Sequence, residues 1–197
     1  MNMQLAEPRT VDTRASERRT RKRRQVKRLS FRNATSADAR QLFTLIEAHA
    51  AEGHLLTRRL DDLTANAPRF AIAEHGGTII GCAELAPLSG RVAEIRSLVV
   101  DASARGLGIG RALVTDLEAC ATREDFASLC AFTHDPRFFV RLGFSLVPHA
   151  WVPEKIAKDC VGCPQFRQCR QSAVVRRLGQ CTRPRSDAFV PLASLRS

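Results

Sequence analysis

Residues 94–111 read E-I-R-S-L-V-V-D-A-S-A-R-G-L-G-I-G-R, and this stretch decides the fold. Before the glycines, β-branched residues predict a strand over Val92 to Val100, which ends at Asp101 and Ser103. After them, apolar residues recur at helical spacing and predict an amphipathic helix whose buried face carries Ile109, Ala112, Leu113, Leu117 and Cys120. The expected local structure is therefore a strand, a glycine loop and a helix.

The loop has glycines at positions 106, 108 and 110. Glycine lets the backbone approach a ligand closely and point its N–H groups at it, and the positive end of the following helix lies behind the loop. The loop therefore suits a pyrophosphate. A plain strand-to-helix turn would need one glycine, and the stretch lacks both the G-K-[ST] ending of a Walker loop and the spacing of a Rossmann fingerprint.

Two signatures resemble those of the GNAT acetyltransferases. R-G-L-G-I-G (residues 105–110) is similar to their [RQ]-x-x-G-x-[GA] loop, which binds the pyrophosphate of acetyl-coenzyme A. About 25 residues later, H-D-P-R-F-F-V-R-L-G-F resembles their helix ending in L-G-F before a strand. The resemblance implies the GNAT fold, an α/β fold of α+β type with a mixed, mostly antiparallel sheet flanked by helices. It also implies acetyl-CoA as co-substrate, bound by Leu98, Val99, Val100, Arg105, Gly106, Leu107, Gly108, Ile109, Gly110, Arg111 and Phe139.

The other elements are expected in an order that agrees with that fold. Residues 26–32 read as a strand, and Thr35 and Asp38 as a capping box before a helix with Leu42 and Ile46 on its apolar face. A second helix is expected over residues 59–65. Strands are expected over 69–75 and 78–86, joined by Gly76-Gly77, and again over 128–133. One helix and one strand then follow, the helix at the second signature.

Charge separates the ends of the chain from its body. Residues 1–30 hold ten Lys and Arg against three acidic residues, and residues 176–197 hold five Arg against one Asp. These ends account for the net charge of +11, so the neutral body is not predicted to bind nucleic acid. We expect a basic disordered arm over 1–25, an acetyltransferase domain over 26–178 and a basic flexible tail over 179–197. Contact of the arm with RNA or an anionic surface is the alternative to a solvated tail.

Composition also sets expectations for location and assembly. A chain of 197 residues has room for one domain with a real core, and a homodimer is one expectation for its assembly. No apolar run approaches 18 residues, so no membrane span is expected. No secretory segment stands near the amino end, and seven cysteines without an export signal point to the cytoplasm.

The last third narrows the resemblance to the single-domain N-acetylglutamate synthases. Residues 153–175, beginning P-E-K-I-A-K-D-C-V-G-C, are similar to the ending of those enzymes, and E-G-H-L-L-T-R-R-L (residues 52–60) resembles their G-x-L-x-x-R segment. The resemblance implies transfer of acetyl to the α-amine of L-glutamate, the first step of arginine biosynthesis. The alternatives are another amino acid, a peptide or a small amine as acceptor, or a non-catalytic module that binds acyl-CoA or RNA.

Amine acylation needs a base, an oxyanion donor and a way to release thiolate. The resemblance places Glu94 as general base, and an ion pair with Arg96 is the alternative role for this carboxylate. A backbone N–H near Leu98 or Val99 would meet the oxyanion. The chain has no Tyr, the usual acid of the second signature. Asp135 would need a raised pKa to replace it, and release without a dedicated acid is the alternative.

The carboxylates of glutamate call for arginine forks. The resemblance implies Arg58 or Arg59 together with Arg170 and Ser172, and Arg96 is a further candidate. An ordinary surface position is the alternative for each arginine. The typical C-D-E ending of the short synthases is here Cys169-Arg170-Gln171, and this departure bears on the identity of the acceptor.

The cysteines allow three interpretations. Cys160, Cys163 and Cys169 begin with the spacing of a zinc site, but they need a fourth ligand such as Cys181, His149 or Asp159, and a second C-x2-C pair is missing. We expect no metal and reduced packing cysteines, with a structural zinc ion or a redox role as alternatives. Three further cysteines lie in apolar runs and are expected in the core, namely Cys82, Cys120 and Cys130.

Overall fold

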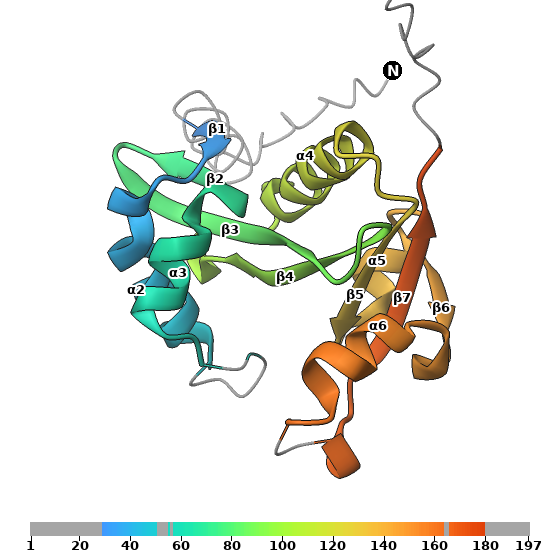
Figure 1. Ribbon diagram of the computed structural model, residues 1–197. Helices are drawn as coiled ribbons and strands as arrows, with labels where there is room; N and C mark the ends of the chain where they lie inside the picture. Colours follow the sequence, from blue (N-terminus) through green and yellow to red (C-terminus); the bar gives the residue numbers. More distant parts are fainter. Residues whose placement is uncertain (1–28, 51–54, 56, 164–165, 180–197) are drawn as a thin grey trace, which may run out of the picture.

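The computed structural model describes residues 29–50, 55, 57–163 and 166–179. Within them seven strands form one sheet in the order β1-β2-β3-β4-β5-β7-β6 (Figure 1). Neighbouring strands are antiparallel except β4 and β5, which are parallel. The strands are β1 Leu29–Asn33, β2 Phe70–His75, β3 Thr78–Pro87, β4 Val92–Val100, β5 Ser128–Thr133, β6 Ser145–Val147 and β7 Ser172–Arg177. The predicted mixed, mostly antiparallel sheet is therefore confirmed.

Helices cover both faces of the sheet. The α-helices are α2 Ala39–Ala50, α3 Leu60–Asn66, α4 Ile109–Arg123, α5 Pro136–Val140 and α6 Pro153–Lys155. A π-helical turn, η5 Ile156–Cys160, continues α6. Short 3-10 turns are η1 Ser36–Asp38, η2 Ala67–Arg69, η3 Ala102–Ala104, η4 His149–Trp151 and η6 Phe166–Gln168.

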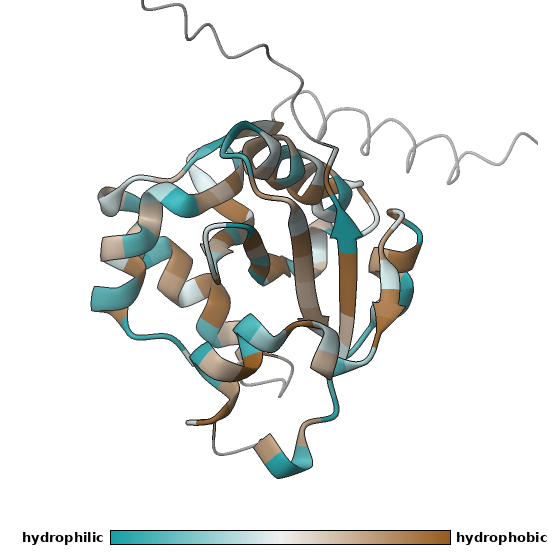
Figure 2. Ribbon diagram, turned by 45° about the vertical axis from the view of Figure 1, so that its right-hand side comes forward, coloured by the Kyte–Doolittle hydropathy of each residue, from teal (hydrophilic) through white to brown (hydrophobic). Residues whose placement is uncertain are grey.

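Alternation along the strands produces two apolar layers. Small residues of β2, β3 and β4 point to the face that α4 covers, among them Ala73, Ala83 and Ala93. Their neighbours point to the opposite face, where Ile72 and Cys82 pack with α2 and α3. Figure 2 shows the apolar residues concentrated on the strands and on the sheet-facing sides of the helices. Because small side chains bring α4 close to the sheet, the loop before α4 is held against β3 and β4.

The sheet opens between β4 and β5, and this fork positions the site. The two strands pair only from Val92 opposite Ser128 to Ile95 opposite Ala131, whereas β4 continues alongside β3 as far as Val100. Figure 1 shows the two halves of the sheet diverging there. A bulge turns β4 just beyond the fork, because Ser97 adopts a φ of 48° and the register with β3 shifts there.

The carboxy-terminal half has more elements than expected, and α6 and η5 are among the additions. Sequence reasoning expected one strand after the second signature, and the structure has two: β6, and β7 inserted between β5 and β6. The first strand begins at Leu29, and residues 26–28 lie outside the described residues, as do the whole predicted arm and nearly all of the predicted tail. Among the described helices, none is long and apolar enough to cross a membrane.

Candidate active site

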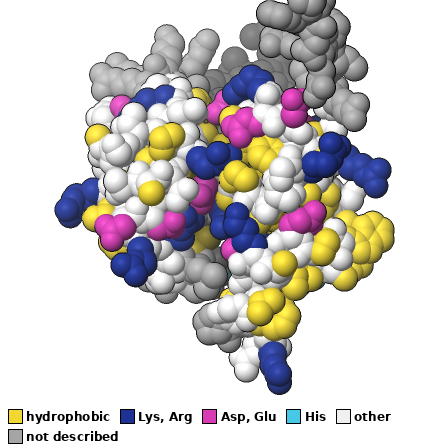
Figure 3. Space-filling model, viewed as in Figure 1, with side chains coloured by type: hydrophobic (Ala, Val, Ile, Leu, Met, Phe, Trp, Pro, Cys, Tyr) yellow, Lys and Arg dark blue, Asp and Glu magenta, His cyan; other side chains and the backbone are white. Residues whose placement is uncertain are grey.

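The fork opens into a cleft of about 1500 Å³. One wall is β4 from Glu94 to Val100, and the other includes β5 and the α6–η5 segment. Figure 3 shows Lys and Arg side chains interspersed with Asp and Glu along the hollow between the two halves of the molecule. The cleft therefore mixes both signs of charge, which suits a ligand with both an amine and a carboxylate better than a long polyanion.

Two residues of the glycine loop, Arg105 and Gly110, line the cleft. Gly106 and Gly108 have φ values of 75° and 83°, which only glycine adopts without strain, and Gly108 is the N-cap of α4. At Gly110 the constraint is steric rather than conformational, because a Cβ there would lie 3.3 Å from Phe138 Cζ. Arg105 Nε donates to the carbonyl of Val100 at 3.2 Å and ties the loop to β4. A helix N-terminus behind an open glycine loop is a geometry that can bind a pyrophosphate, and this role of the loop stays a prediction.

Of the other residues predicted to contact the coenzyme, some line the cleft and others do not. Leu98, Val99 and Val100 line the cleft beyond the fork, where β4 no longer pairs with β5. Phe139 is 4% exposed and packs edge-on between Phe138 and Phe144, with ring centroids 5.2 and 5.3 Å away. Phe139 is therefore mainly a core residue, and Phe138, beside Gly110, is the better candidate for contact with a ligand. Five predicted positions are not among the lining residues, namely Gly106, Leu107, Gly108, Ile109 and Arg111.

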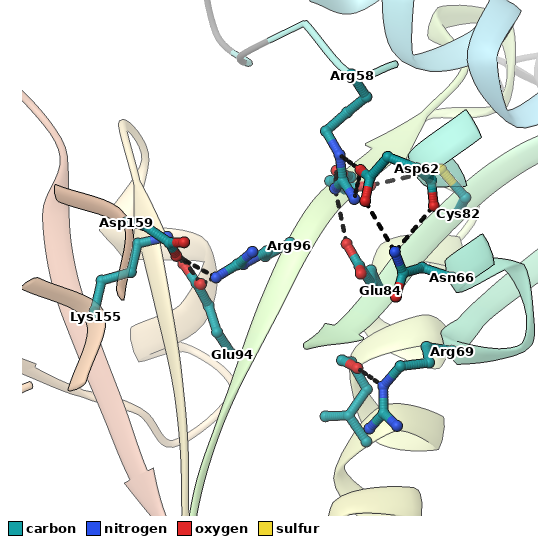
Figure 4. A network of polar contacts seen from close by, with 12 residues as sticks. Arg58, Asp62, Asn66, Arg69, Cys82, Glu84, Glu94, Arg96, Lys155 and Asp159 are labelled. Carbon is teal, nitrogen blue, oxygen red and sulfur yellow. Dashed lines mark hydrogen bonds and ion pairs between the residues drawn. The ribbon is translucent and has the colours of Figure 1, made fainter. Parts of the chain in front are cut away.

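Glu94 lies at the fork within a network of four charges (Figure 4). Its side chain is 3% exposed, and its oxygens accept from Arg96 Nε at 2.5 Å and from Lys155 Nζ at 2.8 Å. Asp159 of η5 pairs with both cations, with Arg96 and with Lys155 at 3.0 Å. Burial opposes the charge of Arg96, but Glu94 and Asp159 raise its pKa above the ordinary value. The ion pair with Arg96 was anticipated, whereas Lys155 and Asp159 were not.

A second network faces the first across β4 (Figure 4). Arg58 Nη1 donates to Glu84 at 2.7 Å and to Ser97 Oγ at 3.1 Å, and its Nε donates to Asp62 at 2.8 Å. Burial opposes the charge of Arg58, but the two carboxylates raise its pKa above the ordinary value. Glu84 is 3% exposed and stands opposite Arg96 in the β3–β4 register. Glu84 is therefore a second buried carboxylate in the cleft, and sequence reasoning missed it because β3 reads as an apolar strand.

The predicted acceptor residues do not all converge. Arg58 and Arg96 line the cleft. The side chain of Arg59 is 87% exposed and pairs loosely with Asp61 at 3.8 Å. Arg170 is exposed and Ser172 is half-buried on β7, and neither is among the lining residues, although Gln171 between them is. The structure thus brings Arg58 and Arg96 together with Lys155, a cation that was not predicted.

Asp135 lies at the rim of the cleft. It is exposed, and its side chain caps α5 by accepting a hydrogen bond from the Arg137 N–H at 3.2 Å. This capping contact gives Asp135 a structural role that needs no proton donation. Its role as general acid stays a prediction.

The cysteines fall into two groups. Cys160, Cys163 and Cys169 are free and all line the cleft, but in the described part of the chain no three metal-ligating side chains are placed to hold an ion. Cys82 and Cys130 are buried, and burial raises the pKa of Cys82 to about 12.

The prediction that Cys120 lies in the core holds only in part, because its side chain packs against the core cluster without being fully buried. Cys120 is only half-buried, and its thiol donates to Glu124 at 3.3 Å. Ala121 is the fully buried residue at this point of α4. Ile109, Leu113 and Leu117 of the expected face are buried as predicted, and Cys120 lies at the edge of that face, partly buried against the same core.

Comparison with known proteins identifies the family. Residues 33–144 match the acetyltransferase (GNAT) family. The chain belongs to this family. Its identity to an uncharacterised N-acetyltransferase of Chlorobaculum tepidum is 35% over 147 residues, covering 75% of this chain and 95% of that one. An amino-acid acetyltransferase of Mycobacterium tuberculosis is 32% identical over 117 residues, which cover 58% of this chain and 67% of that protein. The protein is a GNAT N-acetyltransferase.

Two solved structures extend the likeness. The N-acetylglutamate synthase of Neisseria gonorrhoeae, complexed with coenzyme A and N-acetyl-glutamate, superposes with a TM-score of 0.69 at 28% identity and covers 77% of this chain. The matched region covers 35% of the length of that enzyme. A Mycobacterium tuberculosis protein in complex with CoA superposes with a TM-score of 0.64 at 26% identity, and the match covers 99% of it.

Proposed function

We propose that this enzyme transfers the acetyl group of acetyl-CoA to the α-amine of L-glutamate, with Glu94 as general base. One observation carries the proposal: a buried carboxylate and a pyrophosphate-type loop stand at opposite ends of the free edge of β4. The names of the relatives support an amino acid as acceptor. The Neisseria structure with coenzyme A and N-acetyl-glutamate supports this donor and this acceptor.

The free edge of β4 accounts for the donor. Beyond Ile95 the strand keeps β3 on one side, while β5 has diverged on the other. An extended amide-containing arm can hydrogen-bond to residues 98–100 as an additional strand. The bulge at Ser97 turns the backbone of β4 just after Glu94, which supports a role for a backbone N–H near Leu98 or Val99 in polarising the thioester carbonyl. The helix N-terminus of α4 then meets the pyrophosphate.

The residues of the cleft have separate roles in this transfer. Glu94 accepts a proton from the acceptor amine as it attacks the thioester carbon. The arginines of the cleft, Arg58 and Arg96, hold the acceptor's carboxylates and set the direction of the amine. Low exposure at Glu94 keeps water from the base, which favours amine transfer over hydrolysis. Thiolate leaves without a dedicated donor, since Asp135 caps α5.

A second acceptor class has an observation in its favour. Arg59 and Arg170 lie outside the cleft, and the two arginines within it, Arg58 and Arg96, are already paired with the protein's own carboxylates. An amino acid with one carboxylate, such as glutamine, needs fewer cations. The acceptor panel below separates the two classes.

The test is release of CoA thiol by purified protein with glutamate, glutamine, aspartate, lysine or no amine. We expect the highest kcat/KM with glutamate. Arg58→Gln is expected to lower it by about 10-fold to 100-fold, as loss of a charge-assisted contact predicts. The neighbouring Arg59→Gln, 87% exposed, is the matched control and leaves it unchanged. A higher kcat/KM with glutamine than with glutamate would replace glutamate as the acceptor. The absence of any amine-dependent release of CoA would reject the proposal.

A further inference from the structure

Lys155 places a primary amine against the carboxylate that we assign as general base. Its Nζ lies 2.8 Å from Glu94 Oε1 and 2.9 Å from Oε2, and 3.0 Å from Asp159. The side chain is 15% exposed and its Nζ stands 5.5 Å from the centre of the Phe132 ring. All four residues line the cleft. Figure 4 shows Lys155 reaching from α6 toward Glu94 on β4.

This position is the one that a substrate amine must occupy. A base that acts by direct contact takes its proton from a donor about 2.6 to 3.2 Å away. Any acceptor deprotonated directly by Glu94 must therefore bring its nitrogen to the place where Lys155 Nζ now lies. Lys155 also belongs to the chain itself, so its effective concentration at the site is far above that of a free amine.

We propose that Lys155 is an acetylation site of the enzyme itself, modified in the cleft when no acceptor is bound. The proposal rests on the proposed roles of Glu94 and acetyl-CoA. The Lys155 ammonium gives one proton to Glu94, and the neutral amine attacks the thioester carbon. A C–N bond forms, the C–S bond breaks, and CoA leaves as a thiolate that takes the second amine proton. The products are Nε-acetyl-Lys155 and CoA thiol, and no oxidant or further reactant is needed.

The modification changes the charge of the network. Acetylation removes the positive charge of Lys155, which leaves Glu94 and Asp159 to share Arg96. The acetyl group then occupies the place of the acceptor amine. Bound acceptor and Lys155 therefore compete for Glu94, and glutamate at saturation is expected to suppress the self-modification.

Only four lysines occur in the chain, so peptide mass spectrometry can read each site. Full-length protein is incubated with isotope-labelled acetyl-CoA and no acceptor. We expect label on Lys155 ahead of Lys22, Lys27 and Lys158, at a first-order rate that does not depend on protein concentration. Lys158 is the sharpest internal comparison: it is exposed and also lines the cleft, but its Nζ donates to the carbonyl of Pro87 at 2.6 Å.

Two variants test the mechanism. Glu94→Gln is expected to slow labelling of Lys155 by at least about 100-fold, the lower range for loss of a general base, and its thermal unfolding checks that it folds. Lys158→Arg, the matched lysine control, leaves the labelling of Lys155 unchanged. Label on Lys158 as fast as on Lys155, or full labelling of Lys155 in Glu94→Gln, would mean chemical acetylation and overturn the proposal.

The same experiment separates this proposal from the assigned function. Glutamate-dependent release of CoA with no label on Lys155 rejects the self-acetylation alone. Label on Lys155 without any glutamate-dependent release supports the self-acetylation and rejects glutamate as the acceptor. No transfer to any amine, with acetyl-CoA bound, rejects both.

Discussion

At the scale of single residues, Asp38 joins the start of α2 to the edge of the sheet. Its carboxylate is nearly buried and accepts from the Thr35 N–H at 2.7 Å and from Arg32 at 2.8 and 2.9 Å. The hydrogen bonds from Arg32 hold the pKa of Asp38 well below its ordinary value. A carboxyl group whose pKa is lower in the folded state stabilises the protein above its unfolded pKa, about 3.9. This stabilisation is lost as the pH falls through the folded pKa.

Replacing Asp38 by Asn should therefore cost stability at pH 7 and less at low pH. We expect a loss of about 1 to 3 kcal/mol in the free energy of unfolding at pH 7, measured by urea denaturation. The difference between wild type and variant should shrink below about pH 4, where Asp38 begins to protonate in the unfolded wild-type chain. Asp61→Asn, whose side chain is 91% exposed, is the control and leaves the unfolding curve unchanged. A pH-independent difference at Asp38 would contradict the ion-pair explanation.

The reactivity of each cysteine thiol should depend on its burial. Burial raises the pKa of Cys82 and of Cys130, so neither forms a thiolate readily in the folded protein. Cys169 is exposed at the rim of the cleft. A short pulse of iodoacetamide at pH 8, followed by peptide mapping, should label Cys169 and leave Cys82 and Cys130 unlabelled until denaturant is added. Rapid native labelling of Cys82 would contradict the packing of β3 against α2.

At the scale of elements, the contact between β3 and α4 sets the height of the glycine loop. A Cβ at Gly81 would lie 2.9 Å from Ile109 Cγ2 and 3.3 Å from the carbonyl of Val99. Gly81→Ala must therefore push the first turn of α4 away from the sheet. We expect it to cost about 1 to 3 kcal/mol of stability and to raise the KM for acetyl-CoA. Gly90→Ala, which has open space around it, should change neither value, and an unchanged Gly81→Ala enzyme would argue against this packing.

Elements with local signals were predictable from the sequence. The strand, glycine loop and helix around residues 94–111 are recognisable because their apolar periods and glycines lie within one stretch. The capping box at Thr35 and Asp38 and the hairpin at Gly76-Gly77 are equally local. β7 escaped prediction because its partners, β5 and β6, lie about 45 and 30 residues earlier along the chain. Two of its six residues are arginines, so its pattern alone does not indicate a strand between two others.

In the candidate site, too, contacts between residues close in sequence were predictable and contacts between distant segments were not. The Glu94–Arg96 pair was predictable, because residues two positions apart on a strand point to the same face of the sheet. Lys155 and Asp159 reach Glu94 and Arg96 only because α6 and η5 fold back over the cleft face beside β5, and the sequence gives no sign of that approach. Arg170 matched a motif, yet the structure leaves its side chain exposed. Spacing thus indicated the chemistry, and tertiary packing decided which charges meet.

At the scale of the whole molecule, the fork between β4 and β5 creates the cleft in an otherwise continuous sheet. Parallel pairing at one end holds the halves together, and divergence at the other opens the cleft on both carboxylates, Glu84 and Glu94. Both are 3% exposed and both are paired with arginine, but only Glu94 lies where the strands part. We therefore assign the proton transfer to Glu94 and the placement of Arg58 to Glu84.

The most direct test compares Glu94→Gln with Glu84→Gln in steady-state acetylation of glutamate. We expect Glu94→Gln to lower kcat by about 10²-fold to 10⁴-fold while acetyl-CoA still binds, as loss of a general base does. Glu84→Gln should mainly raise the KM for glutamate, because Arg58 loses one of its two carboxylates. Thermal unfolding of both variants controls for folding. A Glu94→Gln enzyme with the kcat of the wild type would contradict the assignment of the base.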